Sequence, residues 1–156
     1  MRRNVKIGSD APALSGPFYF DASALVKLYL PEPDSASLNR LVAERRDALV
    51  SDLVVTEIVS SLCRRRREGA VSAEVVDRVR REIRSHLDGG VYARVELVAA
   101  VHREAERLLA SIDKVALRAA DALHLALALS GGAATVLTFD RRLADAARAS
   151  GLRVHP

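Results

Sequence analysis

Short apolar runs alternate with segments of helical periodicity along most of this 156-residue chain. Near the end, the apolar run 135–139 stops at Asp140 and a helical pattern continues to Gly151. Near the start, the aromatic run 18–20 stops at Asp21 and a second helical pattern follows. In a parallel sheet every strand-to-helix turn opens at the same edge. We therefore expect Asp21 and Asp140 to face one crevice.

The rest of the chain continues the alternation of strands and helices. Further strands are predicted at 48–51, 94–98 and, as a last edge strand, 152–154. Further helices are predicted at 35–46, 52–68, 72–86, around 101–108 and at 117–129. The helix at 117–129 is apolar on nearly all sides, which is typical of a helix packed in the core. This order predicts an α/β fold, a three-layer α/β/α sandwich with a central, mostly parallel sheet.

The first segment of the chain differs from the rest. Residues 1–17 combine glycine, serine, proline and charged residues without periodicity, which predicts a flexible N-terminal tail before one domain at 18–156. The single cysteine, Cys63, fits a reducing compartment. No apolar run reaches the roughly 18 residues of a membrane span. We expect a cytoplasmic protein that does not contact a membrane.

The charge of the chain is carried mainly by arginine. The 24 basic residues are 21 Arg and 3 Lys, and the formal net charge is +4. Arginine binds phosphate oxygens through its planar fork, but a cluster such as 64–67 also suits the negative end of a helix. With three Phe, three Tyr and no Trp, a platform for stacking bases is not expected. The charge permits a nucleic-acid partner without establishing one.

Two carboxylates interrupt apolar helix faces. Glu57 falls inside an apolar stripe, and Asp121 lies in the first turn of the core helix. Each acid has an ordinary structural interpretation: an ion pair with an arginine for Glu57, and a helix cap for Asp21, Asp121 and Asp140. Four carboxylates gathered at one place nevertheless need a counter-charge. Hard oxygen ligands without a Cys or His set favour Mg²⁺ or Mn²⁺.

The segments around these acids resemble the four acidic motifs of PIN-domain ribonucleases. They are FDASALVKLY with Asp21, TEIVSSL with Glu57, RAADALHLALA with Asp121, and LTFDRRLADAA with Asp140. The similarity covers residues 18–156 and is greatest to the VapC-type toxins of type II toxin–antitoxin pairs. The resemblance implies a metal-dependent endoribonuclease that cuts single-stranded or structured RNA, is inhibited by a small cognate antitoxin and is usually a homodimer.

The resemblance also implies roles for individual residues. The four acids correspond to the catalytic, metal-binding acids of the family, with Asp21 and Asp140 as direct ligands of the metal. Glu57 and Asp121 would bind through water or a second ion. Ser23 lies where the family often carries a hydroxyl near the site. Thr138 shares a strand face with Asp140 and is expected to support the site.

Three other polar residues near these motifs are not assigned to the site. Lys27 follows Asp21 by one and a half helical turns; it could contact a phosphate, but it is interpreted as a solvated surface lysine. His124 follows Asp121 by three residues and is interpreted as a histidine packed in the core. Asp145 lies on a different face of its helix.

Two other classes of function stay open at the level of sequence. A phosphotransfer enzyme or phosphatase-like α/β domain also uses strand-end aspartates with Mg²⁺, although the haloacid dehalogenase-like pattern wants an aspartate where this chain has Ser23. A non-catalytic PIN-like binding module would retain the acids for folding or for a partner. Trapping a phosphoaspartate would identify the first. RNA cleavage that is lost in an aspartate variant would exclude the second.

Overall fold

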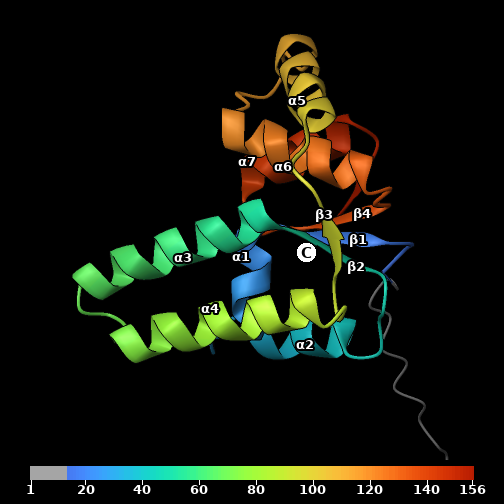
Figure 1. The fold of residues 1–156 in the computed structure, drawn as a ribbon. Coiled ribbons are helices and arrows are strands. Elements are labelled where there is room, and N and C mark those ends of the chain that lie inside the picture. The colour runs from blue at the N-terminus through green and yellow to red at the C-terminus, as the bar shows by residue number, and fades with distance from the viewer. Residues whose placement is uncertain (1–13) are drawn as a thin grey trace, which may run out of the picture.

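Five parallel strands form one sheet through the middle of the molecule (Figure 1). The computed structural model describes residues 14–156, so most of the predicted tail at 1–17 lies outside the described residues. The strands stand in the order β3-β2-β1-β4-β5, and every neighbouring pair is parallel. Their bounds are β1 Phe18–Phe20, β2 Ala48–Ser51, β3 Ala93–Val95, β4 Thr135–Leu137 and β5 Arg153–His155.

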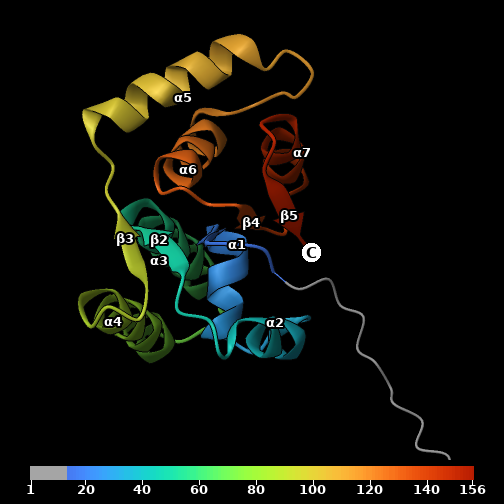
Figure 2. The same cartoon turned by 90° about the vertical axis from the view of Figure 1, so that its right-hand side faces the viewer.

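Helices cover the sheet on both sides. They are α1 Ala22–Leu25, α2 Ser35–Val42, α3 Asp52–Arg67, α4 Ala73–Asp88, α5 Ala99–Ser111, α6 Ala119–Ser130 and α7 Arg141–Ala149, with a 3₁₀ turn η1 at Val26–Leu28. Helices α5, α6 and α7 lie on one side of the sheet, and α1, α2 and α4 lie on the other (Figures 1 and 2). The predicted three-layer α/β/α sandwich is confirmed. No helix in the described part of the chain is long and apolar enough to cross a membrane.

The central strand β1 is the most deeply buried part of the sheet. It pairs with β2 on one side and with β4 on the other. Phe18, Tyr19 and Phe20 are all 0% exposed, as expected for a parallel strand that is covered on both faces. Helix α6 is also buried along most of its length, which confirms the prediction of a core helix.

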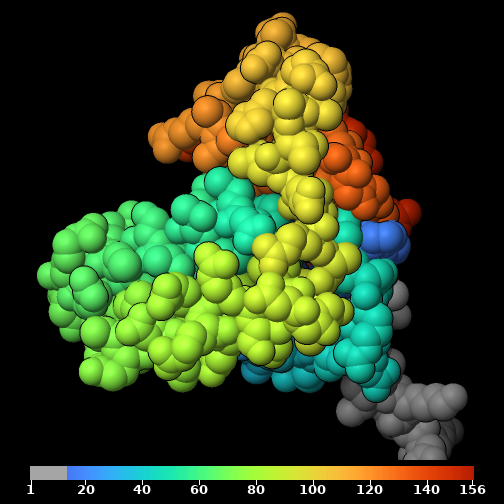
Figure 3. Space-filling view, in the orientation of Figure 1, coloured from blue at the N-terminus to red at the C-terminus, as the bar shows by residue number. Residues whose placement is uncertain are grey.

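Helices α3 and α4 form a hairpin that projects from the body of the molecule (Figures 1 and 3). Each helix begins with a serine cap: the Ser51 hydroxyl accepts from the Val54 amide, and the Ser72 hydroxyl accepts from the Val75 amide. The connection between the helices includes Gly69, whose φ of +74° is a conformation that suits glycine. The far ends of α3 and α4 therefore extend beyond the sheet (Figure 1).

Two predicted boundaries are wrong. Helix α2 ends at Val42 instead of residue 46, because Arg45 turns back and binds its neighbour Asp47 through two hydrogen bonds of 2.8 and 2.6 Å. Strand β3 ends at Val95 instead of residue 98. Val98 is the N-cap residue of α5, so the chain has already left the sheet there.

Residues 14–17 contact the folded domain. The carbonyl oxygens of Leu14 and Gly16 each accept a hydrogen bond of 2.6 Å from Arg45. The Ala134 amide donates to the Pro17 carbonyl at 2.7 Å, just before β4 begins. Ordered packing in the described part of the chain therefore includes residues ahead of position 18, where the predicted domain begins.

Candidate active site

A cleft of about 420 Å³ opens beyond the carboxyl ends of β1 and β4. These strands are neighbours, and the Asp21 amide just beyond β1 donates to the Leu137 carbonyl at 3.1 Å. Asp21, Glu57 and Asp140 all line the cleft. The structure thus brings together three of the four predicted acids, from the end of β1, from α3 and from the start of α7.

Asp21 is buried, with 5% of its surface exposed, and it is held by neighbours from both strand ends. Its Oδ2 accepts hydrogen bonds from the Ser23 hydroxyl at 2.6 Å and from the Thr138 hydroxyl at 2.8 Å. Each hydroxyl in turn accepts a hydrogen bond from a backbone amide of the β4–α7 connection. The Phe139 amide donates to Ser23 at 2.9 Å, and the Asp140 amide donates to Thr138 at 3.0 Å. The two predicted supporting residues therefore tie Asp21 to the segment that carries Asp140.

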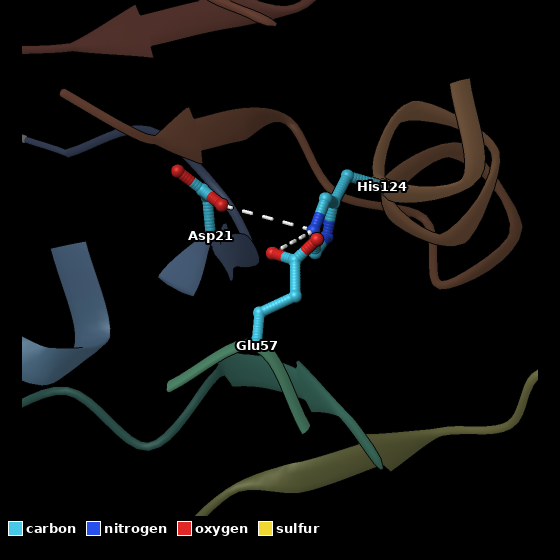
Figure 4. A group of neighbouring side chains, drawn as sticks. All are labelled: Asp21, Glu57 and His124. Atoms are coloured by element: carbon cyan, nitrogen blue, oxygen red, sulfur yellow. Dashed lines mark hydrogen bonds and ion pairs between the residues drawn. The ribbon is translucent and has the colours of Figure 1, made fainter. Parts of the chain in front are cut away.

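The other oxygen of Asp21 faces the cleft. Oδ1 accepts the Ala22 amide at 2.6 Å and lies 3.8 Å from Nε2 of His124 (Figure 4). Asp21 is also the N-cap residue of α1, so the carboxylate adjoins the positive end of a short helix. Oδ2 is thus held by two hydroxyls of the fold, whereas Oδ1 accepts a single short hydrogen bond.

Glu57 is oriented by a chain of hydrogen bonds, of which Figure 4 shows the one from His124 to Glu57. Its Oε2 lies 2.8 Å from Nε2 of His124, and Nδ1 of the same ring lies 2.9 Å from the Tyr19 hydroxyl. The Tyr19 hydroxyl lies 2.9 Å from the hydroxyl of Ser51, the N-cap residue of α3. The chain of bonds therefore begins at the cap of the helix that carries Glu57 and returns to Glu57 through the core.

The direction of these bonds follows from their partners. An ionised carboxylate only accepts hydrogen bonds, so Nε2 of His124 carries a proton and donates to Glu57. Burial by itself lowers the pKa of His124, but the hydrogen bond to Glu57 and the surrounding carboxylates raise it above its ordinary value. Burial raises the pKa of Tyr19, so its phenol stays protonated. His124 is therefore a donor that fixes Glu57 in the cleft.

Asp140 and Asp121 both serve helix termini, but in different surroundings. Asp140 is exposed, and its Oδ1 accepts the amides of Arg142 and Leu143 at 2.8 and 3.2 Å, which caps α7. Oδ2 of Asp121 accepts the Arg118 amide at 3.0 Å and lies 3.5 Å from Arg142. Asp121 is not among the residues that line the cleft. Arg142 thus supplies a counter-charge to Asp121, and binding of Asp121 to a metal through water or a second ion stays a prediction.

One interpretation of a single residue is wrong, and a second is confirmed but incomplete. Lys27 is not solvated: its side chain is 11% exposed and lines the cleft. His124 is buried as predicted, at 3% exposure, but it also contacts the candidate site. The signal for His124 was its position one helical turn after Asp121 in an apolar helix, where a polar ring needs a partner. That partner, Glu57, is 67 positions away in the sequence.

The donor atoms in the cleft suit a divalent cation. One ligand atom each from Asp21, Glu57 and His124 lies within 4.8 Å of the others. Because Nε2 of His124 donates to Glu57, the oxygens of the carboxylates are the better ligands. Asp140 lines the same cleft, and only one of its oxygens makes hydrogen bonds within the described residues. Such oxygen-rich donor sets fit Mg²⁺ or Mn²⁺.

Comparison with known proteins gives one sequence family and one fold. The sequence model of the PIN domain matches residues 18–149. Ribonuclease VapC45 of Mycobacterium tuberculosis is 38% identical over 142 residues, which cover 88% of this chain and 94% of that protein. Its name describes an enzyme that acts on RNA.

Two solved structures are similar in fold. One is Mycobacterium tuberculosis VapC20, described as a sarcin–ricin loop cleaving toxin, with a TM-score of 0.68 and 20% identity over 89% of this chain and 99% of that chain. The other is VapBC2 from Rickettsia felis bound to a DNA fragment from their promoter, with a TM-score of 0.64 and 12% identity over 90% of this chain and 98% of that chain. At these identities the two structures bear on the fold alone.

Proposed function

Because this chain belongs to the PIN domain family, we propose that it is a metal-dependent endoribonuclease and the toxin of a type II toxin–antitoxin pair. The observation that carries the proposal is the convergence of Asp21, Glu57 and Asp140 on one cleft. The identity to a ribonuclease over most of the chain supports RNA as the substrate class. The four acidic motifs support the assignment to the VapC type.

Glu57 and Asp140 are each held through one oxygen, and within the described residues Oδ1 of Asp21 accepts only the Ala22 amide, so each of the three carboxylates keeps an oxygen that a ligand can approach. Ser23 and Thr138 hold Asp21, His124 holds Glu57, and the first amides of α7 hold Asp140. Carboxylates that are fixed in advance need no rearrangement when charge develops in the reaction, and such preorganisation is a large part of catalysis. We assign Asp21, Glu57 and Asp140 as the acids of the reaction.

The proposed cofactor is Mg²⁺ or Mn²⁺, held by Asp21 and Asp140 with Glu57 beside them. The chemistry that a bound divalent cation supplies at such a site is activation of a water and neutralisation of charge on the phosphoryl group. The residues of the chain would orient the phosphodiester. Asp121 enters this proposal only as an outer residue, because it is paired with Arg142.

The proposed partners follow from the family. They are an RNA substrate, a small cognate antitoxin protein and a second copy of the chain in a homodimer, all in the cytoplasm. Sedimentation velocity of the purified protein tests the homodimer. Copurification of this chain with the product of a short adjacent reading frame tests the antitoxin.

Cleavage of RNA by the purified protein tests the proposed enzyme. We expect cleavage of cellular RNA in Mg²⁺ or Mn²⁺, no cleavage in EDTA, and a rate reduced at least 100-fold in Asp140→Asn, which keeps the helix cap without the charge. Asp145→Asn on the same helix is the matched control and should cleave like the wild type. Equal activity of Asp140→Asn and Asp145→Asn would contradict the assignment. If the protein cleaves RNA neither in Mg²⁺ nor in Mn²⁺, the result would favour the non-catalytic binding module.

Growth of a host cell gives a second readout. Expression of the wild-type chain alone is expected to arrest growth, and expression of Asp140→Asn at the same soluble yield is not. Measuring the soluble yield separates toxicity from aggregation. Arrest of the same severity with both proteins would rule out RNA cleavage as its cause.

A further inference from the structure

Three charged side chains from separate segments meet on the wall of the cleft. Oε1 of Glu32 accepts a hydrogen bond from the Arg65 guanidinium at 2.6 Å, and Oε2 lies 3.5 Å from the Lys27 ammonium. All three residues line the same cleft as the carboxylates of the candidate active site. Two cations are thus bridged by the two oxygens of one anion.

Lys27 is held in place by three groups. Besides facing Glu32, its ammonium donates to the Pro33 carbonyl at 2.9 Å and lies 4.5 Å from the centroid of the Phe139 ring. With 11% of the side chain exposed, the ammonium has exchanged most of its water for these contacts. A lysine is seldom ordered in this way on a solvated surface, where its flexible stem keeps several rotamers.

The turn that carries Glu32 is rigid. Prolines precede and follow Glu32, which fixes φ at positions 31 and 33. The Glu32 amide donates to the Ser35 hydroxyl at 2.9 Å, and that hydroxyl donates to the Leu30 carbonyl at 3.0 Å. Asp34 adopts a φ of +71°, a conformation that few residues other than glycine adopt. The position of the carboxylate between the two cations is therefore built into the backbone.

Two cations bridged by two oxygens also form the arrangement that receives a phosphate. A phosphodiester presents two free oxygens of comparable spacing, and arginine can bind such a group through several N–H donors. In the described part of the chain, the Arg65 guanidinium makes its one hydrogen bond to Glu32 and is 36% exposed. Its remaining donors are available to a ligand in the cleft.

We propose that Lys27 and Arg65 form a subsite for a backbone phosphate of RNA, and that Glu32 is the anion with which this phosphate competes. The inference rests on the proposed function, because it assigns the place of the substrate strand beside the metal-binding acids. Contacts to phosphate position a strand without reading its bases. The subsite thus sets the register of cleavage and leaves the choice of sequence to other contacts.

The position of Arg65 along α3 sets how far the subsite lies from the acids. Glu57, Ser61 and Arg65 all line the cleft and follow one another at intervals of four residues on α3. At 1.5 Å of rise per residue, the backbone of Arg65 is about 12 Å from that of Glu57 along the helix. A strand in stacked geometry advances about 3.4 Å per phosphate. A phosphate at the subsite therefore belongs to a nucleotide a few positions from the cleaved bond.

Binding of RNA in the absence of metal tests the subsite without depending on cleavage. Fluorescence anisotropy would follow a labelled, mixed-sequence, single-stranded RNA in EDTA over a series of KCl concentrations. The variants are Lys27→Met, Arg65→Met and Glu32→Gln. The matched control is Arg107→Met on α5, which also removes an arginine from an ion pair, here with Glu104, on a surface outside the cleft.

We expect Lys27→Met and Arg65→Met each to weaken binding by roughly threefold to tenfold and to reduce the slope of log affinity against log salt by about 0.7. Arg107→Met should leave the slope unchanged. Glu32→Gln should bind more tightly than the wild type at low salt, because it removes the competing charge. Slopes of Lys27→Met and Arg65→Met equal to that of Arg107→Met would overturn the subsite, and weaker binding by Glu32→Gln would overturn the competition.

Two further measurements separate folding and catalysis from the subsite. Circular dichroism verifies that the variants fold, and Lys27→Gln replaces Lys27→Met if the apolar side chain is not tolerated. The more exposed Arg65 decides the result if neither lysine variant folds. Cleavage by the wild type with unchanged slopes in the variants would refute the subsite alone. Reduced slopes without cleavage in any metal would refute the proposed enzyme and leave the phosphate subsite standing.

Discussion

At the scale of single residues, the acids of the cleft differ in how they are attached to the fold. Asp21 is buried and accepts bonds from backbone and side-chain donors through both oxygens. Asp140 is exposed and uses one oxygen to cap a helix. The same chemical change, aspartate to asparagine, therefore has different consequences for stability at the two positions.

Asp21→Asn is expected to destabilise the metal-free protein by about 1–3 kcal/mol, because an amide nitrogen must face a backbone N–H whichever way it is oriented. Asp140→Asn is expected to change stability by no more than about 0.5 kcal/mol, since asparagine caps helices as well as aspartate does. Thermal melts of both variants in EDTA measure the difference. A loss of the same size in both variants would show that burial of Asp21 does not decide the outcome.

A second prediction concerns His124. His124→Phe keeps a ring of similar shape but removes the donor to Glu57 and the partner of the Tyr19 hydroxyl, so we expect a loss of about 1–3 kcal/mol and a smaller rise in melting temperature on addition of Mg²⁺. Tyr19→Phe is the control, because it removes the hydroxyl on the far side of the ring and keeps the bond to Glu57. It should lose stability but retain the response to Mg²⁺. An unchanged Mg²⁺ response in His124→Phe would exclude a positioning role for the histidine.

Individual residues of the site could be predicted only in part. Asp21 and Asp140 lie where the ends of neighbouring parallel strands must lie, so their proximity followed from the pattern of strands. The partners of His124 and Asp121 could not be found in this way. They are Glu57 and Arg142, and each pairing depends on how helices pack and not on any local signal. Ligation of the metal by the four acids stays a prediction.

At the scale of elements, the two helices of the projecting hairpin begin with the same residue in different surroundings. The Ser51 and Ser72 hydroxyls each accept a backbone amide at 3.4 Å. Ser51 is 0% exposed and also meets the Tyr19 hydroxyl, whereas Ser72 is exposed. Comparing Ser51 with Ser72 therefore separates the contribution of a helix cap to stability from the contribution of a buried hydrogen bond.

Ser72→Ala is expected to cost about 1 kcal/mol through loss of the cap alone. Ser51→Ala loses the cap and also one partner of the buried Tyr19 hydroxyl, so we expect a loss larger by about 1–2 kcal/mol. With about 2–4 °C per kcal/mol for a domain of this size, the two melting temperatures should differ by several degrees. Equal shifts would mean that the Tyr19 hydroxyl finds another partner.

The elements themselves were predicted more completely than their ends. Apolar runs bounded by capping residues located all five strands and the helices between them, because periodicity reports which side of each element is buried. The errors at α2 and β3 came from contacts beyond the element. Arg45 ends α2 by turning to Asp47 and to the carbonyls of residues 14 and 16, which no helical pattern records.

At the scale of the whole molecule, a metal that binds only the folded state stabilises the entire domain. At a Mg²⁺ concentration 100 times the dissociation constant, the wild type should gain about 2.7 kcal/mol, which raises the melting temperature by roughly 5–11 °C. Asp140→Asn should gain less at the same concentration, and Asp145→Asn should gain as much as the wild type. A titration monitored by thermal unfolding gives the dissociation constant. An equal gain in all three proteins would indicate binding away from the cleft.

The order of the strands also constrains when the protein becomes active during its own synthesis. One of the two hydroxyls that hold Asp21 belongs to Thr138, 117 positions later in the chain. At about 5–20 residues per second, translation needs roughly 6 to 23 s to cover that distance. Until β4 is made and docks beside β1, the nascent chain has neither the hydrogen bond from Thr138 to Asp21 nor the residue Asp140. A growing chain therefore lacks a complete candidate site until most of the domain has been made.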